Sequence, residues 1–300
     1  MYKQILVPLD GSSFAEAALP LALALSAKTK ANLHLVAVVE PIPAFAYEEW
    51  ESAAKEWSAE YLAAVADRIS NGDGKVTTAL LTGHVVETLL ETARATKADL
   101  VVMATHGRGA LSRAWLGSVA DGLMRQAEVP VLFVRPEEKR TPPPEPRKDF
   151  ETILVPLDGS ELSESALEHA AEFGELFGSA YHLTRIVSYP IDIASPYLPH
   201  TVQLNQTVLA EAKVAAAEYL EDQADRLRKR GSRVTTSVIV DAQPGPGILA
   251  ETEAVGADLV AMATHGRKGV GRLILGSAAD KVLRGTHVPL LLYRPAKKPS

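Results

Sequence analysis

Two copies of one short motif carry the residues of this chain that are best suited to chemistry. Each copy begins with Ala-Thr-His-Gly, continues through nine residues that start with Arg, and ends with Gly-Ser; the copies span residues 104–118 and 263–277. Glycine lets a backbone come close to an anion because it has no Cβ, and the N-terminus of a following helix favours negative charge. We therefore expect each copy to form a loop that binds phosphate.

The motif lies between a strand pattern and a helix pattern. Apolar runs at residues 100–103 and 259–262 precede the copies, and a helical pattern over residues 119–127 follows the first. Ser118 with Asp121, and Ser277 with Asp280, have the spacing of a capping box. Both serines are therefore expected to cap helices, and a capping serine can also contact phosphate.

An aspartate in each half is expected to face this loop. Asp10 and Asp158 each end an apolar run and precede Gly-Ser. Alternating strands and helices predict parallel sheets with right-handed crossovers, in which ligands bind at the carboxyl ends of the strands, where strand order reverses. If the first and fourth strands are neighbours, the aspartate and the loop meet there. The alternative is that both aspartates are only turn or N-cap residues.

The rest of the pattern fills in an α/β unit. Ser13 to Glu16 has capping-box spacing for a first helix, and apolar positions stepping by three or four over residues 48–70 predict a helix whose aromatic residues, Trp57 among them, face the core. The other expected elements are strands at residues 5–9, 32–39, 76–82 and 129–134 and a helix at residues 85–96.

The second half of the chain repeats the first. Residues 153–160 are identical to residues 5–12, and residues 288–295 resemble residues 129–136. The repeat predicts a first domain over residues 1–136, a Pro-rich linker over 137–150 and a second domain over 151–295. The second half adds residues 188–203, which either cover a ligand or are a surface elaboration.

Composition excludes several classes of protein. The 300 residues include no cysteine, which excludes disulfides and thiolate chemistry, and the net charge of −6 argues against broad binding to nucleic acid or to an anionic membrane. No apolar run is long enough to span a membrane, and the N-terminus lacks the profile of a signal peptide. The protein is expected in the cytoplasm.

The sequence gives little support to three more specific interpretations: a zinc site, a serine hydrolase and a dinucleotide-binding loop. His106 and His265 lack a second ligand at the short spacing of a zinc motif, and a hydrolase built on Ser118, His106 and Asp10 lacks the Gly-x-Ser-x-Gly elbow. The segment 245–250 matches Gly-x-Gly-x-x-Ala, but it follows the third strand of its half and contains a proline. A Walker phosphate loop is absent from the sequence.

These residues resemble the universal stress protein family, and the whole chain is similar to two such domains in tandem. The nucleotide-binding branch of the family carries Gly-x2-Gly-x9-Gly-(Ser/Thr) after the fourth strand, and both copies of the motif fit this pattern except at its first position. The resemblance implies two Rossmann-like domains of the adenine nucleotide alpha hydrolase-like type, each with a five-stranded parallel sheet flanked by helices.

The resemblance also implies where a nucleotide binds. Asp10 and Asp158 hold ribose hydroxyls, Val38 and Ile186 offer backbone atoms to adenine, and the glycines and serines of the motif cradle phosphates. Arg108 and Arg267 are either phosphate contacts or solvated loop residues. The full expected set is Pro8, Asp10, Val38, Ala104, His106, Gly107, Arg108, Gly117, Ser118 and Val119, with Pro156, Asp158, Ile186, Ala263, His265, Gly266, Arg267, Gly276, Ser277 and Ala278 in the second half.

One departure from the family pattern is shared by both halves. Ala104 and Ala263 stand where the pattern has its first glycine. If that position needs a positive φ, alanine costs about 1 kcal/mol, and if it needs only a close approach, one methyl group shifts the ligand.

The expected function is that of a sensor or adaptor in a stress response that binds ATP, ADP or AMP, with or without Mg²⁺ or Mn²⁺, and has no catalytic residue of its own. The alternatives are a slow ATP-hydrolysing enzyme and a nucleotide-free module for dimerisation. The final strands, residues 131–134 and 290–293, are apolar and would be an aggregation hazard if bare. We expect them to pair with each other, which joins the domains, or with a second chain in a homodimer.

Overall fold

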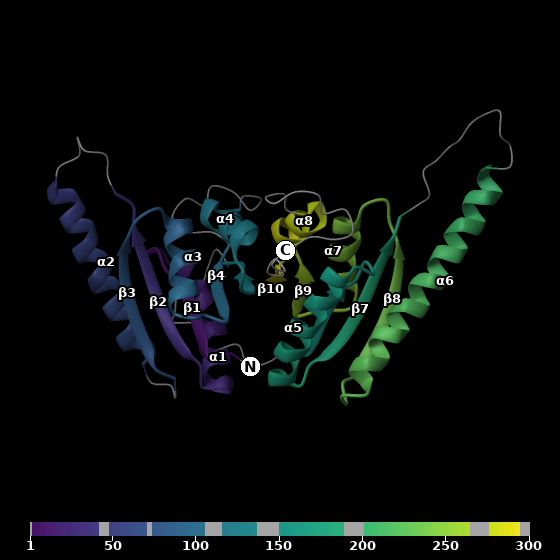
Figure 1. The fold of residues 1–300 in the computed structure, drawn as a ribbon, viewed down its shortest axis with the longest axis horizontal. Helices are drawn as coiled ribbons and strands as arrows, with labels where there is room; N and C mark the ends of the chain where they lie inside the picture. Colours follow the sequence, from purple (N-terminus) through teal and green to yellow (C-terminus); the bar gives the residue numbers. More distant parts are fainter. Residues whose placement is uncertain are drawn as a thin grey trace, which may run out of the picture. The chain divides into compact units, whose positions relative to one another are not determined.

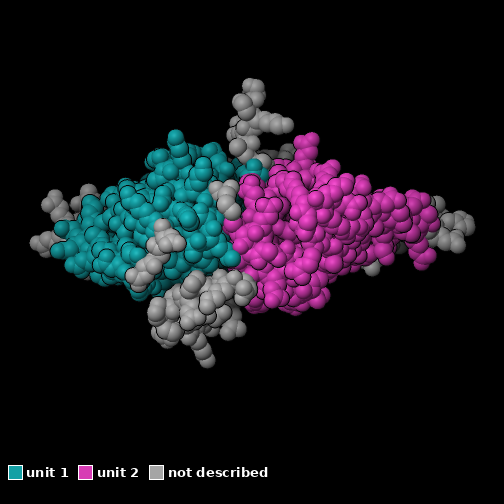
Figure 2. Space-filling model, turned by 90° about the horizontal axis from the view of Figure 1, so that it is seen from below, with its two compact units in different colours: residues 1–149, 289–300 teal, residues 150–288 magenta. Residues whose placement is uncertain are grey.

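Two α/β units make up the protein. The computed structural model describes residues 2–41, 48–70, 74–105, 116–136, 150–188, 201–264 and 276–294. Unit 1 holds residues 1–149 and 289–300, and unit 2 holds residues 150–288 (Figure 2). Both units alternate strands and helices along the chain (Figure 1), which confirms the predicted fold class.

Unit 1 is a parallel sheet with one antiparallel strand added. Its strands run in the order β3-β2-β1-β4-β5-β10, and β1 to β5 are mutually parallel where they pair. The strands are β1 (Gln4–Pro8), β2 (Asn32–Val39), β3 (Val76–Thr82), β4 (Leu100–Ala104), β5 (Val131–Val134) and β10 (Leu290–Tyr293). The helices are the 3₁₀ helix η1 (Ala15–Ala18), α1 (Leu19–Thr29), α2 (Glu48–Ile69), α3 (Val85–Ala95) and α4 (Ser118–Gln126).

Unit 2 repeats this order as β9-β6-β7-β8. Its strands are β6 (Thr152–Pro156), β7 (Ala180–Val187), β8 (Val234–Val240) and β9 (Leu259–Ala263), and its helices are α5 (Glu161–Phe177), α6 (Thr201–Arg228), α7 (Pro244–Ala254) and α8 (Ser277–Gly285). In both units the strand order reverses beside the first strand, between β1 and β4 and between β6 and β9. The neighbouring strands that the predicted site requires are thus present.

Buried apolar strands explain why the sheets form. Ile5, Leu6 and Val7 of β1 are fully buried, and the matching residues 153–155 of β6 are buried to the same extent. Strands buried on both faces read as continuous apolar runs, because helices cover each side of a parallel sheet. In unit 2, α5 packs on β6 and β9, α6 packs on β7 and β8, and α7 packs on β7 and on α8.

The predicted pairing of the two final strands is confirmed. Strand β10 runs antiparallel to β5, with Leu291 opposite Leu132 and Leu290 opposite Phe133. All of these side chains are buried. Strand β5 begins two residues later than predicted; Pro130 has no N–H to contribute to a ladder.

The predicted orientation of the helix over residues 48–70 is wrong for Trp57. The helix is present, but its buried stripe is Ser58, Leu62, Val65 and Ile69, and Trp57 is 47% exposed. The indole stacks on Tyr61, with ring centroids 5.7 Å apart. Val65 and Ile69 are buried as the sequence pattern predicted, but before them the buried positions are Ser58 and Leu62 in place of Trp57 and Tyr61.

Two further boundaries differ from expectation. The chain after Asp10 enters the 3₁₀ helix η1 before α1, and the hydroxyl of Ser12, not Ser13, accepts from the N–H of Ala15 at 3.1 Å. The last residues of the predicted 188–203 insertion belong to α6, while residues 189–200 lie outside the described part of the chain. Within the described ranges, no helix is long and apolar enough to cross a bilayer.

Candidate functional site

Each aspartate ends its strand in a tight turn. Asp10 Oδ1 accepts from the N–H of Ser12 at 3.0 Å and from its hydroxyl at 2.6 Å. Asp158 Oδ1 accepts the same two bonds from Ser160 at 3.0 and 2.6 Å. The glycine between them has φ near +80° in both turns, a conformation that favours glycine. The turn role left open by the sequence is therefore real, and both carboxylates stay half-buried at the carboxyl end of the first strand.

A backbone hydrogen bond joins the two ends of each glycine loop. The N–H of Gly117 donates to the carbonyl of Thr105 at 2.9 Å, and the N–H of Gly276 donates to the carbonyl of Thr264 at 2.9 Å. Both threonines are buried. The two ends of the loop are thus fixed beside the carboxyl end of the fourth strand.

The turn and the loop meet at one edge of the sheet. Ile5 pairs with Leu100 and Leu6 with Val101 in a parallel ladder. The residues that follow these pairs therefore leave both strands at the same edge of the sheet. Strands β6 and β9 repeat this register. The structure therefore brings Asp10 and the base of its loop to the same edge of the sheet, and does the same for Asp158.

The predicted capping role of the two serines is wrong. Gly117 and Gly276 are the N-cap residues of α4 and α8, and Ser118 and Ser277 are the first, exposed residues of these helices. The capping-box partner Asp121 instead forms an ion pair with Arg125 at 2.8 Å. Asp280 pairs in the same way with Arg284 at 2.9 Å. A pair four residues apart lies on one helix face, which the local spacing did not distinguish from a capping box.

The two alanines of the motif carry no backbone strain. Ala104 ends β4, opposite Val134 of β5, and Ala263 ends β9. The non-glycine residues with positive φ in the described ranges are Lys30 and Lys97. Backbone strain is thus ruled out, and the bulk of the methyl group is the effect that can still act on a ligand. Both alanines are buried.

The structure describes six more members of the expected set. Pro8 and Pro156 end β1 and β6, Val38 and Ile186 lie one residue before the ends of β2 and β7, and Val119 and Ala278 are the second residues of α4 and α8; all six are half-buried. The remaining members, His106, Gly107, Arg108, His265, Gly266 and Arg267, lie outside the described residues.

A polar cluster beside each aspartate turn was not predicted. Tyr61 of α2 donates to Glu16 Oε1 at 3.1 Å, and Arg68 forms an ion pair with the same carboxylate. Burial, followed by Glu16, raises the pKa of Tyr61, and Asp10 contributes in the same direction. Tyr219 repeats the bond to Glu164 at 3.1 Å. A shared spacing of seven residues between each tyrosine and its arginine, Tyr61–Arg68 and Tyr219–Arg226, was the available signal.

The glycine-rich segment at residues 245–250 is not a cofactor loop. It forms the first turns of α7. A Cβ on Gly245 would lie 2.7 Å from Cβ of Lys281, and one on Gly247 would lie 3.1 Å from Cδ1 of Ile186. Helix packing therefore accounts for both glycines. Within the described ranges, no group of three acidic or histidine side chains could hold a metal ion.

Fold and site together define the class of protein. Two Rossmann-like repeats in tandem each bring an aspartate turn and a glycine-closed loop to the reversal point of a parallel sheet. The family model described as the universal stress protein family matches residues 1–135 and 149–294. The chain belongs to the universal stress protein family.

Several known proteins share this organisation. A universal stress protein of Mycobacterium tuberculosis is 29% identical over 323 residues, which cover 99% of this chain and 96% of that protein. Another from the same organism is 30% identical over 209 residues, and this match covers 70% of this chain and 65% of that protein. The crystal structure of a universal stress protein from Archaeoglobus fulgidus superposes with a TM-score of 0.73 at 20% identity, over 98% of both chains, which shows the shared fold.

Proposed function

We propose that each repeat binds one adenine nucleotide and that the protein acts as a nucleotide-dependent sensor or adaptor in a stress response. One observation carries this proposal: both units place an aspartate turn next to a loop closed on glycine, where strand order reverses. Ligands of open α/β sheets bind at this point. The duplication matters because two copies of the same geometry argue against chance.

The groups at this edge fit a nucleotide. A carboxylate accepts hydrogen bonds from a ribose diol, and Asp10 and Asp158 are already oriented by their serines. The first N–H groups of α4 and α8 have no carbonyl partner within their helices and suit phosphate oxygens, as do the exposed hydroxyls of Ser118 and Ser277. Backbone atoms of Val38 and Ile186 would face the base.

A divalent cation would enter with the nucleotide. Mg²⁺ or Mn²⁺ neutralises phosphate charge and takes most of its ligands from phosphate oxygens and water. The residues of the chain then orient the ribose and the phosphates. The two expected domains, residues 1–136 and 151–295, each hold one complete set of these groups.

Extraction of bound nucleotide tests the proposal directly. The purified chain is denatured and the released small molecules are separated by chromatography, and the nucleotide-free protein is then titrated with ATP, ADP and AMP by calorimetry. We expect an adenine nucleotide in the extract or a clear heat of binding. An empty extract together with no heat would contradict the proposal and favour a nucleotide-free interaction module.

Phosphate release separates a sensor from an enzyme. With ATP and Mg²⁺ or Mn²⁺, we expect turnover far below the typical enzyme rate of about 10 s⁻¹. Rapid phosphate release that Asp10→Asn with Asp158→Asn abolishes would identify an ATP-hydrolysing enzyme instead.

Light scattering tests the homodimer predicted from the final strands, whose β5 and β10 edges already pair within one chain.

A further inference from the structure

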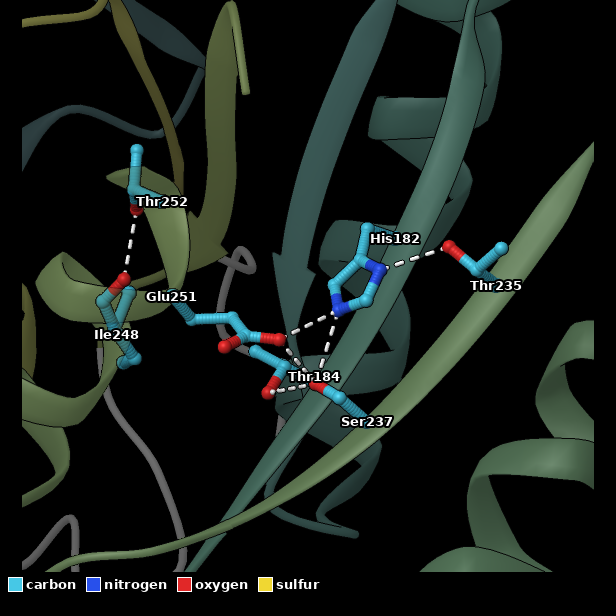
Figure 3. Close-up of polar contacts among 7 residues, drawn as sticks. All are labelled: His182, Thr184, Thr235, Ser237, Ile248, Glu251 and Thr252. Carbon is cyan, nitrogen blue, oxygen red and sulfur yellow. Dashed lines mark hydrogen bonds and ion pairs between the residues drawn. The ribbon is translucent and has the colours of Figure 1, made fainter. Parts of the chain in front are cut away.

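A partly buried polar network joins three elements of unit 2 (Figure 3). His182 Nε2 of β7 lies 2.8 Å from Glu251 Oε1 of α7 and 2.9 Å from Ser237 Oγ of β8. The hydroxyl of Ser237 also donates to Glu251 Oε1 at 2.6 Å and lies 3.0 Å from Thr184 Oγ1. His182 is 8% exposed and Thr184 is fully buried. Ser237 and Glu251 are half-buried, so the network links helix to sheet at a partly buried position.

The arrangement does not suit nucleophilic catalysis. In a catalytic triad the serine and the carboxylate bond to opposite nitrogens of the imidazole. Here Ser237 and Glu251 approach the same nitrogen, Nε2, while Nδ1 lies 2.8 Å from Thr235 Oγ1. The polar groups of the network pair with one another, so its role lies in fixing the strands and the helix that it joins.

Unit 1 lacks this network although it keeps the histidine. His34 occupies the place of His182 and bonds to Thr77 at 2.8 Å, as His182 does to Thr235. The register puts Val36 in place of Thr184 and Ala79 in place of Ser237. Thr92 stands in place of Glu251, and its hydroxyl donates to the carbonyl of Thr88 inside its own helix at 2.6 Å.

Part of the network lies on the same strand, β7, as one expected ligand contact, Ile186. Thr184 precedes Ile186 by two residues on β7, so both side chains lie on the same face of the sheet, which α7 covers. Helix α7 carries Glu251, and Gly247 lies one turn earlier on the same helix. A Cβ added to Gly247 would lie 3.1 Å from Cδ1 of Ile186, so the backbone of the helix packs closely against this side chain. Bonds from Glu251 to β7 and β8 therefore fix the helix that packs against Ile186.

We propose that His182, Ser237 and Glu251 are positioning residues that hold Ile186 for contact with the base, so that the second site distinguishes bases more strictly than the first. This inference rests on the proposed nucleotide binding. The Glu251 side chain is 12% exposed and makes two hydrogen bonds, and it resists displacement because breaking them would leave the largely buried His182 without one of its partners. Strand β2 in unit 1 has no such anchor at the equivalent positions.

The preference for ATP over GTP tests the proposal, because residues with a purely structural role would not change it. In a chain whose first site is weakened by Asp10→Asn, the dissociation constants of ATP, GTP and inorganic tripolyphosphate are measured with and without Glu251→Ala. We expect the preference for ATP over GTP to fall by about tenfold or more, which is about 1.4 kcal/mol. Tripolyphosphate binding should stay unchanged, because it does not involve the base.

Conservative variants keep the test decisive if Glu251→Ala folds poorly. Glu251→Gln keeps an acceptor for Ser237 and His182 and should retain the ATP preference, whereas Ser237→Ala installs the residue of unit 1 and should lower it. Thr92→Ala is the matched control in unit 1 and should change nothing at the second site.

The outcomes separate two kinds of failure. An unchanged ATP:GTP ratio in folded Glu251→Ala and Ser237→Ala, or equal weakening of all three ligands, would overturn the positioning role while nucleotide binding stands. Absence of nucleotide binding by the Asp10→Asn chain and by the unmodified chain would overturn the proposed function itself, and the inference with it.

Discussion

Asp10 and Asp158 each hold a tight turn at the carboxyl end of a strand. One carboxylate oxygen of each holds the turn to the following serine. The sequence predicted the importance of both aspartates but left the turn and the ligand roles as alternatives. The structure shows the turn role, and the ligand role stays a proposal that the turn supports by orienting the carboxylate at the edge of the sheet.

Ala104→Gly with Ala263→Gly tests the departure from the family pattern. Both alanines end buried strands without positive φ, so glycine relieves no strain and should lower the free energy of unfolding by about 0.5–1 kcal/mol at each site. Removing the methyl groups should tighten ATP binding, because the backbone can come closer to the ligand. Calorimetry and urea unfolding measure the two effects, and weaker ATP binding in the folded double variant would contradict this account.

His34 predicts a loss of stability in acid. Burial lowers the pKa of His34 below its usual value of 6.5. The folded chain then binds fewer protons than the unfolded chain between that lowered pKa and 6.5, so the free energy of unfolding falls as pH drops through this window. Burial also lowers the pKa of His169, against the opposing effect of Glu172 and Glu168.

Urea unfolding near pH 7.5 and near pH 5.5 measures this loss. His34→Gln keeps a hydrogen-bonding partner for Thr77 but cannot gain a proton, so we expect a smaller difference between the two pH values than in the unmodified chain. His287→Gln, on an exposed histidine, is the matched control. Equal pH dependence in His34→Gln and the unmodified chain would count against this assignment.

At the scale of elements, strands were more predictable than helix faces. The strands at residues 32–39 and 76–82 match the sequence prediction at both ends, because each is rich in apolar and β-branched residues and is followed by a turn residue, Pro41 or Gly83. Trp57 was misplaced because α2 buries a narrow stripe and an aromatic residue can cover the edge of a helix. The tyrosine clusters were missed because each glutamate lies on a different helix from its tyrosine, and the shared Tyr–Arg spacing alone does not identify it.

Gly174 predicts a packing requirement specific to unit 2. A Cβ at this position of α5 would lie 2.6 Å from Cζ of Tyr181. Tyr181 is 2% exposed and donates to the carbonyl of Ala171 at 3.1 Å, and burial, followed by Glu175, raises its pKa to about 12. The ring therefore cannot move away cheaply. Gly174→Ala should destabilise the protein by about 1–3 kcal/mol, although alanine favours helices.

A double-mutant cycle isolates the cause. Unit 1 has Ser26 and Leu33 at the equivalent positions. Tyr181→Leu should therefore relieve much of the cost of Gly174→Ala, and the coupling is read from chemical unfolding of the two single variants and the double variant. Additive effects would show that the two residues do not compete for space.

At the scale of the whole molecule, the repeat made the fold predictable. Residues 5–12 recur as residues 153–160, and each recurrence supports the same strand order and the same predicted site at the edge of the sheet. Pairing of β5 with β10 followed from their apolar character, since a bare edge of that kind is unfavourable. The His182 network could not be predicted, because its members come from β7, β8 and α7 and contact one another only after folding.

Titration of paired aspartate variants tests the central claim most directly. Asn at position 10 or 158 can still accept from the serine of its turn but loses the charge that a ribose diol favours, so each change should weaken one site by about tenfold or more. Asp67→Asn and Asp222→Asn remove exposed carboxylates from α2 and α6 and serve as matched controls.

Calorimetry of ATP binding should give a definite pattern across these variants. The unmodified chain and both controls should bind one ATP per repeat with their usual affinity, Asp10→Asn and Asp158→Asn should each weaken one of the two sites, and the double variant should weaken both. ATP binding by the folded double variant with unchanged affinity and stoichiometry would contradict the claim that these aspartate turns form the nucleotide sites.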